Sequence, residues 1–69
     1  MDRKLTQLGG CEADNCPKVF LDPASKTVVV QGDLADLSGE LGPAGAGEAR
    51  VMIPLAVLDE AAGKRATLR

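Results

Sequence analysis

The chain has 69 residues and a formal net charge of −2, from eight Lys and Arg against ten Asp and Glu, which gives no electrostatic basis for binding nucleic acid. A single Phe is its only aromatic residue and His is absent, so it lacks the stacking surface of single-stranded nucleic-acid binders and the commonest general base. A domain this small buries too little apolar surface to offset the entropy of folding easily. We therefore expect oligomerisation or a bound metal to stabilise the fold further.

Residues 1–10 are mostly polar and end in Gly9-Gly10, which predicts a flexible N-terminal arm. The rest divides into a single α+β domain over residues 11–63 and a basic C-terminal tail over residues 64–69. The first ten residues lack the apolar core of a signal peptide, and no run is long enough to span a membrane. We therefore expect a cytoplasmic protein.

Cys11 and Cys16 are the candidate metal ligands. In a reducing compartment such a pair stays as two thiols. Its spacing is wider than that of the usual two-residue zinc knuckle but still allows two zinc ligands from one loop, and a symmetric dimer would supply the pair twice to complete an all-sulfur site. A local disulfide is the third alternative, and it needs an oxidising setting. We expect no cofactor other than zinc at this pair.

Two apolar runs, residues 18–21 and 27–31, flank a strong turn signal. Asp22 favours the first position of a turn, and Pro23 presets φ at the second. Gly32 ends the second run. These features predict two strands joined as a hairpin.

Residues 33–41 leave two interpretations open. Leu34, Leu37 and Leu41 recur at the spacing of one helical face, but a Ser-Gly pair interrupts the pattern. A short helix lying on one face of the sheet and an irregular loop both fit. Residues 42–47 are rich in Gly and Pro, which indicates a flexible connector.

Residues 49–53 are the third predicted strand, and Pro54 both ends it and suits the first turn of a helix. The expected apolar face of that helix comprises Leu55, Leu58 and Ala62, extended by Val57 and Ala61. Gly63 fits the position after its end. The expected fold is α+β: a three-stranded antiparallel sheet, made of a hairpin and one further strand, with a short C-terminal helix on one face.

The three predicted strands contain unbroken apolar triplets. Side chains alternate between the two faces of a sheet, so such triplets place apolar groups on both faces, and both need a cover. The C-terminal helix supplies one cover, and a second copy of the chain or another protein is expected to supply the other. The predicted interface residues are Phe20, Val29 and Met52. Residues 31–49 also contain four acids and no base. This acidic stretch is either a solvated loop or a surface for a basic partner.

Residues 49–58 resemble the strand–Ile-Pro–helix element of AbrB-type swapped-hairpin DNA-binding proteins. That resemblance would imply a DNA-binding dimer, although only Arg50 represents the basic residues of the family's DNA face. A second resemblance covers most of residues 16–62. Cys16-Pro17, Val-Val-Gln-Gly at residues 29–32 and Gly-Glu-x-x-Val-x-Ile-Pro at residues 47–54 are similar to patterns in small uncharacterised proteins from actinobacteria. Their frequent position beside helix-turn-helix regulators implies an accessory or regulatory role.

Catalysis is not expected, because Ser25 and Ser38 are the only serines and no His accompanies them. The predicted function is a non-enzymatic protein-binding or regulatory accessory module, acting as a homodimer or with a protein partner. The alternatives are a structural domain stabilised by a zinc ion and an AbrB-like DNA-binding dimer. We expect no membrane partner, and nucleic acid is not the expected partner.

Overall fold

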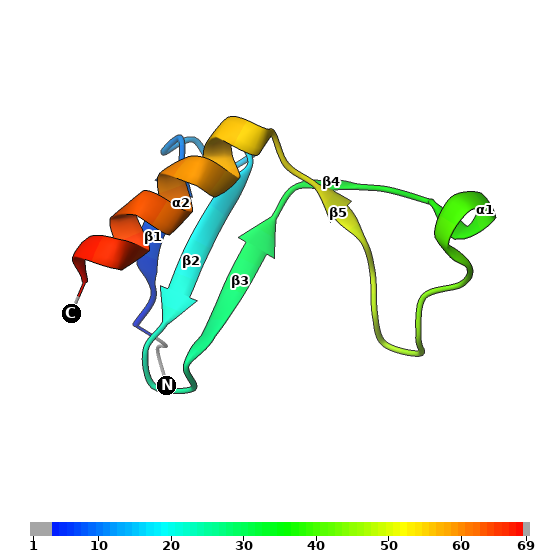
Figure 1. Ribbon diagram of the computed structural model, residues 1–69, viewed down its shortest axis with the longest axis horizontal. Helices are drawn as coiled ribbons and strands as arrows, with labels where there is room; N and C mark the ends of the chain where they lie inside the picture. Colours follow the sequence, from blue (N-terminus) through cyan, green and yellow to red (C-terminus); the bar gives the residue numbers. More distant parts are fainter. Residues whose placement is uncertain (1–3, 69) are drawn as a thin grey trace.

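The computed structural model describes residues 4–68. Its elements in chain order are β1 (Thr6–Gly10), β2 (Lys18–Asp22), β3 (Thr27–Gln31), β4 (Asp33–Leu34), α1 (Ser38–Leu41), β5 (Val51–Met52) and α2 (Leu55–Thr67). Strands β1, β2 and β3 form an antiparallel sheet with β2 in the centre, and α2 lies across one face (Figure 1). The predicted α+β class is confirmed. We call this sheet with α2 the lobe, and residues 33–52 the arm.

The hairpin of β2 and β3 is the predicted one, and its register is continuous. Opposite Val19, Phe20 and Leu21 of β2 stand Val30, Val29 and Val28 of β3. In the turn, the Asp22 carboxylate accepts hydrogen bonds from the Ala24 N–H (3.2 Å) and the Ser25 hydroxyl (2.9 Å). The side chain predicted at the first turn position therefore fixes the turn.

The third strand of the sheet comes from the N-terminal segment. The prediction that residues 1–10 form a flexible N-terminal arm is therefore wrong for Thr6–Gly10. Strand β1 pairs antiparallel with β2 along the side that β3 leaves free, and a bulge interrupts the register between Gln7 and Gly9. Leu8 lies in this bulge and is buried. The sequence concealed the strand because a single large apolar residue followed by two glycines carries no strand periodicity.

The core lies between α2 and the strands β1 and β2. The buried hydrophobic residues of the described chain are Leu8, Val19 and Ala61, and around them pack Leu21, Ile53 and Val57. Gly9 permits this close packing. A Cβ atom on Gly9 would lie 2.9 Å from the Val57 carbonyl oxygen and 3.2 Å from the Ala61 nitrogen, so any larger residue would push the helix off the strand.

Helix α2 turns a different face to the sheet from the one that its sequence predicts. Ala61 is buried and Val57 half-buried, whereas Leu55 and Leu58 are 72% and 52% exposed. The approach of Gly9 accounts for the difference, because a strand so close leaves room for a side chain no larger than that of Ala61. Two leucines of the predicted core therefore face outward.

Helix α2 also continues through Gly63, the predicted end, and reaches Thr67. Glycine inside a helix costs only about 1 kcal/mol relative to alanine, and the good helix formers that follow it offset this cost. Most of the predicted tail over residues 64–69 is therefore helix. Residues 1–3 of the predicted N-terminal segment and Arg69 of the predicted C-terminal tail lie outside the described residues.

The arm leaves the lobe after β3 and returns to it at the start of α2 (Figure 1). Its strands pair antiparallel as Asp33 with Met52 and Leu34 with Val51. The predicted third strand over residues 49–53 is thus present only as β5, and it pairs in the arm rather than in the sheet of the lobe. The short helix considered within residues 33–41 forms as α1, but it lies away from the sheet.

Several hydrogen bonds brace the arm internally, and two of them involve Arg50. The Ala35 N–H donates to the Arg50 carbonyl oxygen (3.0 Å), and Arg50 Nη1 donates to the Gly42 carbonyl oxygen (2.7 Å). Among residues 4–68, no helix has both the length and the apolar character needed to cross a membrane.

Candidate functional site

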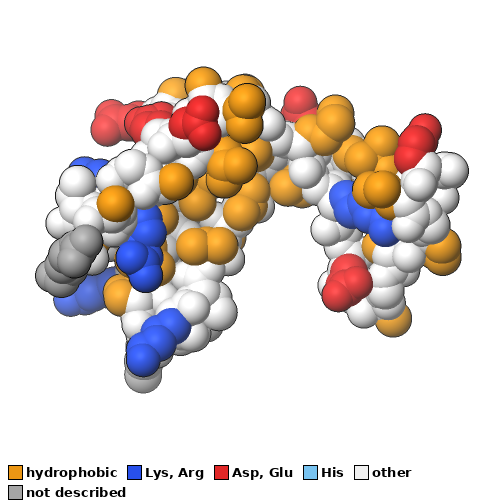
Figure 2. Space-filling model, viewed as in Figure 1, with side chains coloured by type: hydrophobic (Ala, Val, Ile, Leu, Met, Phe, Trp, Pro, Cys, Tyr) orange, Lys and Arg blue, Asp and Glu red, His pale blue; other side chains and the backbone are white. Residues whose placement is uncertain are grey.

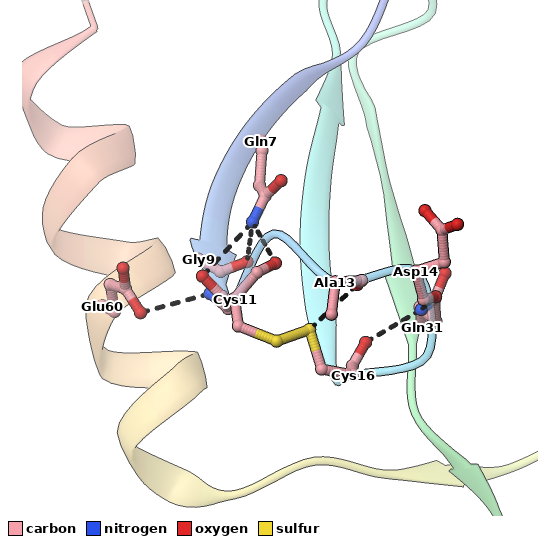
Figure 3. The surroundings of a disulfide bond; sticks show 9 residues. Gln7, Gly9, Cys11, Ala13, Asp14, Cys16, Gln31 and Glu60 are labelled. Carbon is pink, nitrogen blue, oxygen red and sulfur yellow. Dashed lines mark hydrogen bonds between the residues drawn. A yellow bond between two sulfur atoms is a disulfide. The ribbon is translucent and has the colours of Figure 1, made fainter.

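Two regions carry the residues predicted to function: the loop that contains both cysteines and the apolar surface of β3 and the arm. In the first region, Cys11 and Cys16 are joined by a disulfide, with their Cα atoms 6.1 Å apart (Figure 3). The loop connects β1 to β2 at the end of the sheet where α2 passes β1.

Side chains from two strands hold this loop. Gln7 Nε2 of β1 lies within hydrogen-bond distance of the carbonyl oxygens of Gly9 (3.3 Å), Gly10 (3.2 Å) and Cys11 (3.0 Å). From β3, Gln31 Nε2 donates to the carbonyl oxygens of Asp14 and Cys16, at 2.8 Å each (Figure 3).

The contact from α2 reaches the strand just before this loop. Glu60 Oε1 accepts a hydrogen bond from the Gly10 N–H at 3.2 Å (Figure 3). The loop is therefore tied to two strands directly, and to the helix through the end of β1.

The disulfide bears on the zinc prediction for Cys11 and Cys16. Zinc binds thiolates, and a sulfur in a disulfide has no thiolate to offer, so the prediction applies only to the reduced protein. Within residues 4–68, no three His, Cys, Asp or Glu side chains are grouped so that they could hold a metal ion. A zinc site in the reduced protein would need cysteines from a second copy.

Removing the disulfide is expected to destabilise the protein moderately. For a closed loop this short, the chain-entropy model predicts that replacing both Cys11 and Cys16 by Ser lowers the free energy of unfolding by about 2 kcal/mol. Urea denaturation followed by circular dichroism would measure the loss. Wild-type protein in excess reductant is the matched control and should show the same loss. Equal midpoints for oxidised wild type and the double variant would show that the bond contributes nothing.

The second region is an apolar surface that the lobe's own helix leaves open. Helix α2 contacts β1 and β2, and all three valines of β3 are exposed. The free side of β3 has no pairing partner among the described residues. We call this side, over Thr27–Gln31, the β3 edge.

The arm contributes further exposed apolar residues. Seven large apolar residues of β3 and the arm are exposed by 36–80%: Val28, Val29, Val30, Leu34, Leu41, Val51 and Met52. No described residue of the arm is buried. Figure 2 shows apolar side chains on both the lobe and the arm, with a deep concavity between the two.

The predicted interface residues lie in two separate places. Phe20 and Val29 stand opposite each other on β2 and β3, and they face away from the core residue Val19. Met52 lies in the arm, because β5 does not join the sheet of the lobe. The face that Phe20 and Val29 share also carries Lys18, so it is not the continuous apolar face expected from the triplets.

Sequence reasoning missed a pocket beside the β2–β3 turn. It has a volume of about 460 Å³ and is lined by Leu21, Pro23, Lys26, Val28, Arg65 and Leu68. We call it the turn pocket. Its aliphatic walls and its two cationic side chains suit a group that is both apolar and negatively charged. No sequence signal indicates it, because the end of α2 and the turn meet only in the folded chain.

The acidic stretch predicted over residues 31–49 lies almost entirely in the arm. Its acids Asp33, Glu40 and Glu48 are exposed. Asp36 accepts hydrogen bonds from the Ser38 backbone N–H (3.2 Å) and hydroxyl (2.9 Å). These bonds, the backbone one first, hold the pKa of the Asp36 carboxyl below its usual range.

Comparison of the chain with protein-family models, curated proteins and solved structures found no match.

Proposed function

We propose that this protein is a non-enzymatic protein-interaction module that acts as a homodimer. One observation carries the proposal: the described chain buries three hydrophobic residues and exposes eleven large ones. Soluble monomers scatter apolar residues over their surface but rarely leave so many of their large ones uncovered in neighbouring elements. A protein surface that covers these residues would supply the burial that the small core lacks.

The arm supports the same function. A two-stranded ribbon and a single helical turn are marginally stable by themselves. The arm nevertheless projects from the lobe with no buried residue of its own. Packing against another protein chain would give it a stable position.

The similarity to small actinobacterial proteins, which is carried by Cys16-Pro17 and the patterns at residues 29–32 and 47–54, supports an accessory or regulatory role. The proposed location is the cytoplasm. In that compartment the Cys11–Cys16 disulfide would meet a reducing environment. The assembly should therefore be measured with the bond oxidised and with it reduced.

Replacing Val29 with Asp tests the proposed function. Val29 is exposed at the centre of β3, so the variant should fold, whereas in a dimer that buries this position the carboxylate would be desolvated without a partner. Such burial costs several kcal/mol, so we expect the dimer dissociation constant to rise by about a hundredfold or more. Sedimentation equilibrium and native mass spectrometry would measure it.

Ala13→Asp is the matched control, because it adds the same charge at an exposed position in the cysteine loop. It should leave the dimer intact. A wild-type protein that remains monomeric at all concentrations, or a Val29→Asp variant with unchanged assembly mass, would overturn the proposed function as stated.

A further inference from the structure

We infer that two copies of this chain join through antiparallel pairing of their β3 edges and lay their arms reciprocally over each other's turn pockets. This inference rests on the proposed homodimer and names its geometry. The partner is a second copy because the chain carries both halves of each contact. The β3 edge is complementary to itself, and the acidic arm is complementary to the basic turn pocket.

The β3 edge is built to be paired. Natural sheets protect their free edges with charged residues, prolines or bulges. Strand β1, at the other side of the sheet, contains a bulge. Strand β3 has the sequence Thr-Val-Val-Val-Gln, pairs with β2 in continuous register and has none of these protections. Strand addition would satisfy its outward N–H and C=O groups.

Pairing of β3 with itself is self-complementary. An antiparallel pair centred on Val29 places Val28 opposite Val30 of the partner subunit and Thr27 opposite Gln31 of the partner subunit. No charged residue meets a like charge. The valines at positions 28 and 30 then form one apolar group on the face that carries α2, since they stand opposite the core-side residues Leu21 and Val19.

The same pairing brings the arm to the partner's turn pocket. In an antiparallel pair, the end of one β3 lies beside the start of the other. The arm continues from the end of β3, and Lys26 of the turn pocket immediately precedes its start. Asp33 therefore comes beside Lys26 of the partner subunit. Figure 1 shows the arm extending away from the lobe on the open side of β3, where a second lobe would lie.

The arm and the turn pocket match in charge and polarity. Residues 33–52 contain four acids and one base, and that base, Arg50, is engaged with the Gly42 carbonyl oxygen inside the arm. The turn pocket carries Lys26 and Arg65 around aliphatic walls. An acidic segment that also exposes Leu34 and Leu41 is the complement of such a pocket.

The exposed apolar area would supply a large part of a stable dimer interface. The seven exposed large residues of β3 and the arm together offer several hundred Å² of surface, close to the largest apolar patch of an ordinary monomer and approaching the about 800 Å² per partner of a stable interface. Backbone pairing along β3 and the rest of the arm would complete it.

A charge-exchange experiment tests the arm contact. One chain carries Asp33→Lys and Glu40→Lys, which leaves the hydrogen bonds between Asp36 and Ser38 intact. The other carries Lys26→Asp and Arg65→Glu, where Asp tolerates the left-handed backbone of Lys26 (φ 57°). Each chain alone then sets like charges against each other between arm and pocket, whereas a mixed pair restores opposite charges in both contacts.

We expect each charge-reversed chain alone to dimerise at least about tenfold more weakly than wild type. The equimolar mixture should recover the affinity as a heterodimer, which native mass spectrometry identifies by mass. Restored pairing in the mixture supports the arm contact. Unchanged dimerisation of the separate chains, or a mixture no tighter than they are, would overturn it.

An isotope-filtered nuclear Overhauser experiment on mixed labelled and unlabelled wild-type protein tests the strand register. We expect contacts between the Val28 methyl groups of one chain and those of Val30 of the partner subunit. A dimer without them would overturn the β3 pairing. If the wild type is a dimer that Val29→Asp dissociates, the proposed function stands even when either experiment rejects this geometry. A monomeric wild type would overturn both the proposed function and the geometry.

Discussion

Replacing Gly10 with Ala is expected to lower the free energy of unfolding by about 3 kcal/mol or more. Gly10 has a φ of +99°, a region that residues with a Cβ atom rarely adopt. The added Cβ would also collide with the Pro17 carbonyl oxygen and lie 2.8 Å from the Lys18 Cα atom. Both are backbone atoms of the loop end and β2, so neither a rotamer change nor a flexible side chain can relieve the contact.

Urea denaturation followed by circular dichroism measures this loss. Gly63→Ala is the matched control, because the position lies inside α2 and a Cβ atom there meets no described atom within 4 Å apart from its chain neighbours and the nearby backbone of its own helix. The control should gain up to about 1 kcal/mol from the better helix propensity of Ala. Similar midpoints for the two variants would contradict the pairing of Gly10 with Lys18.

Replacing Leu8 with Ala is expected to lower the free energy of unfolding by about 3 kcal/mol. Leu8 is buried in the bulge of β1, where it packs with Val19 and Ala61. In so small a core, the cavity left by one side chain removes a large share of the buried apolar contact. The same denaturation measurement applies.

Leu5→Ala is the control for that substitution. Leu5 precedes β1 and is exposed, so its truncation should change the free energy of unfolding by no more than about 0.5 kcal/mol. If the two variants lost the same amount, β1 would not belong to the cooperatively folded unit. The pair therefore tests the placement of the N-terminal segment in the sheet.

The β2–β3 hairpin was predictable because its information is local. The apolar runs, the Asp22-Pro23 turn signal and the Gly32 stop all lie within fifteen residues, and the structure repeats the predicted pairing. The strand over residues 49–53 was predictable as a strand but not in its pairing, because a short apolar run does not indicate which neighbour it will meet.

The glycines near the N-terminus illustrate why the placement of β1 and the buried face of α2 could not be predicted. Gly9 and Gly10 look like the end of a flexible segment, yet one permits the approach of α2 and the other carries a positive φ between two paired strands. Both roles depend on residues far along the chain. The same approach decides that Ala61 rather than Leu58 faces the sheet, a choice that helical periodicity leaves open.

The candidate site was predictable in part. The sequence singled out Cys11 and Cys16 as a pair, and the structure selects the disulfide from the three alternatives. Phe20 and Val29 do share a face, which follows from strand alternation and register. The turn pocket escaped because Lys26 and Arg65 come together only through the tertiary fold.

The contact between β1 and α2 also sets an order for folding during synthesis. The N–H of Gly10 donates to Glu60, 50 residues later, and the core closes around Ala61. A chain emerging from the ribosome can form the β2–β3 hairpin early, but β1 has no helix to cover it until α2 has emerged. Such long-range closure slows folding relative to domains held by local contacts. The sheet therefore stays uncovered until α2 has been made, and the core forms only then.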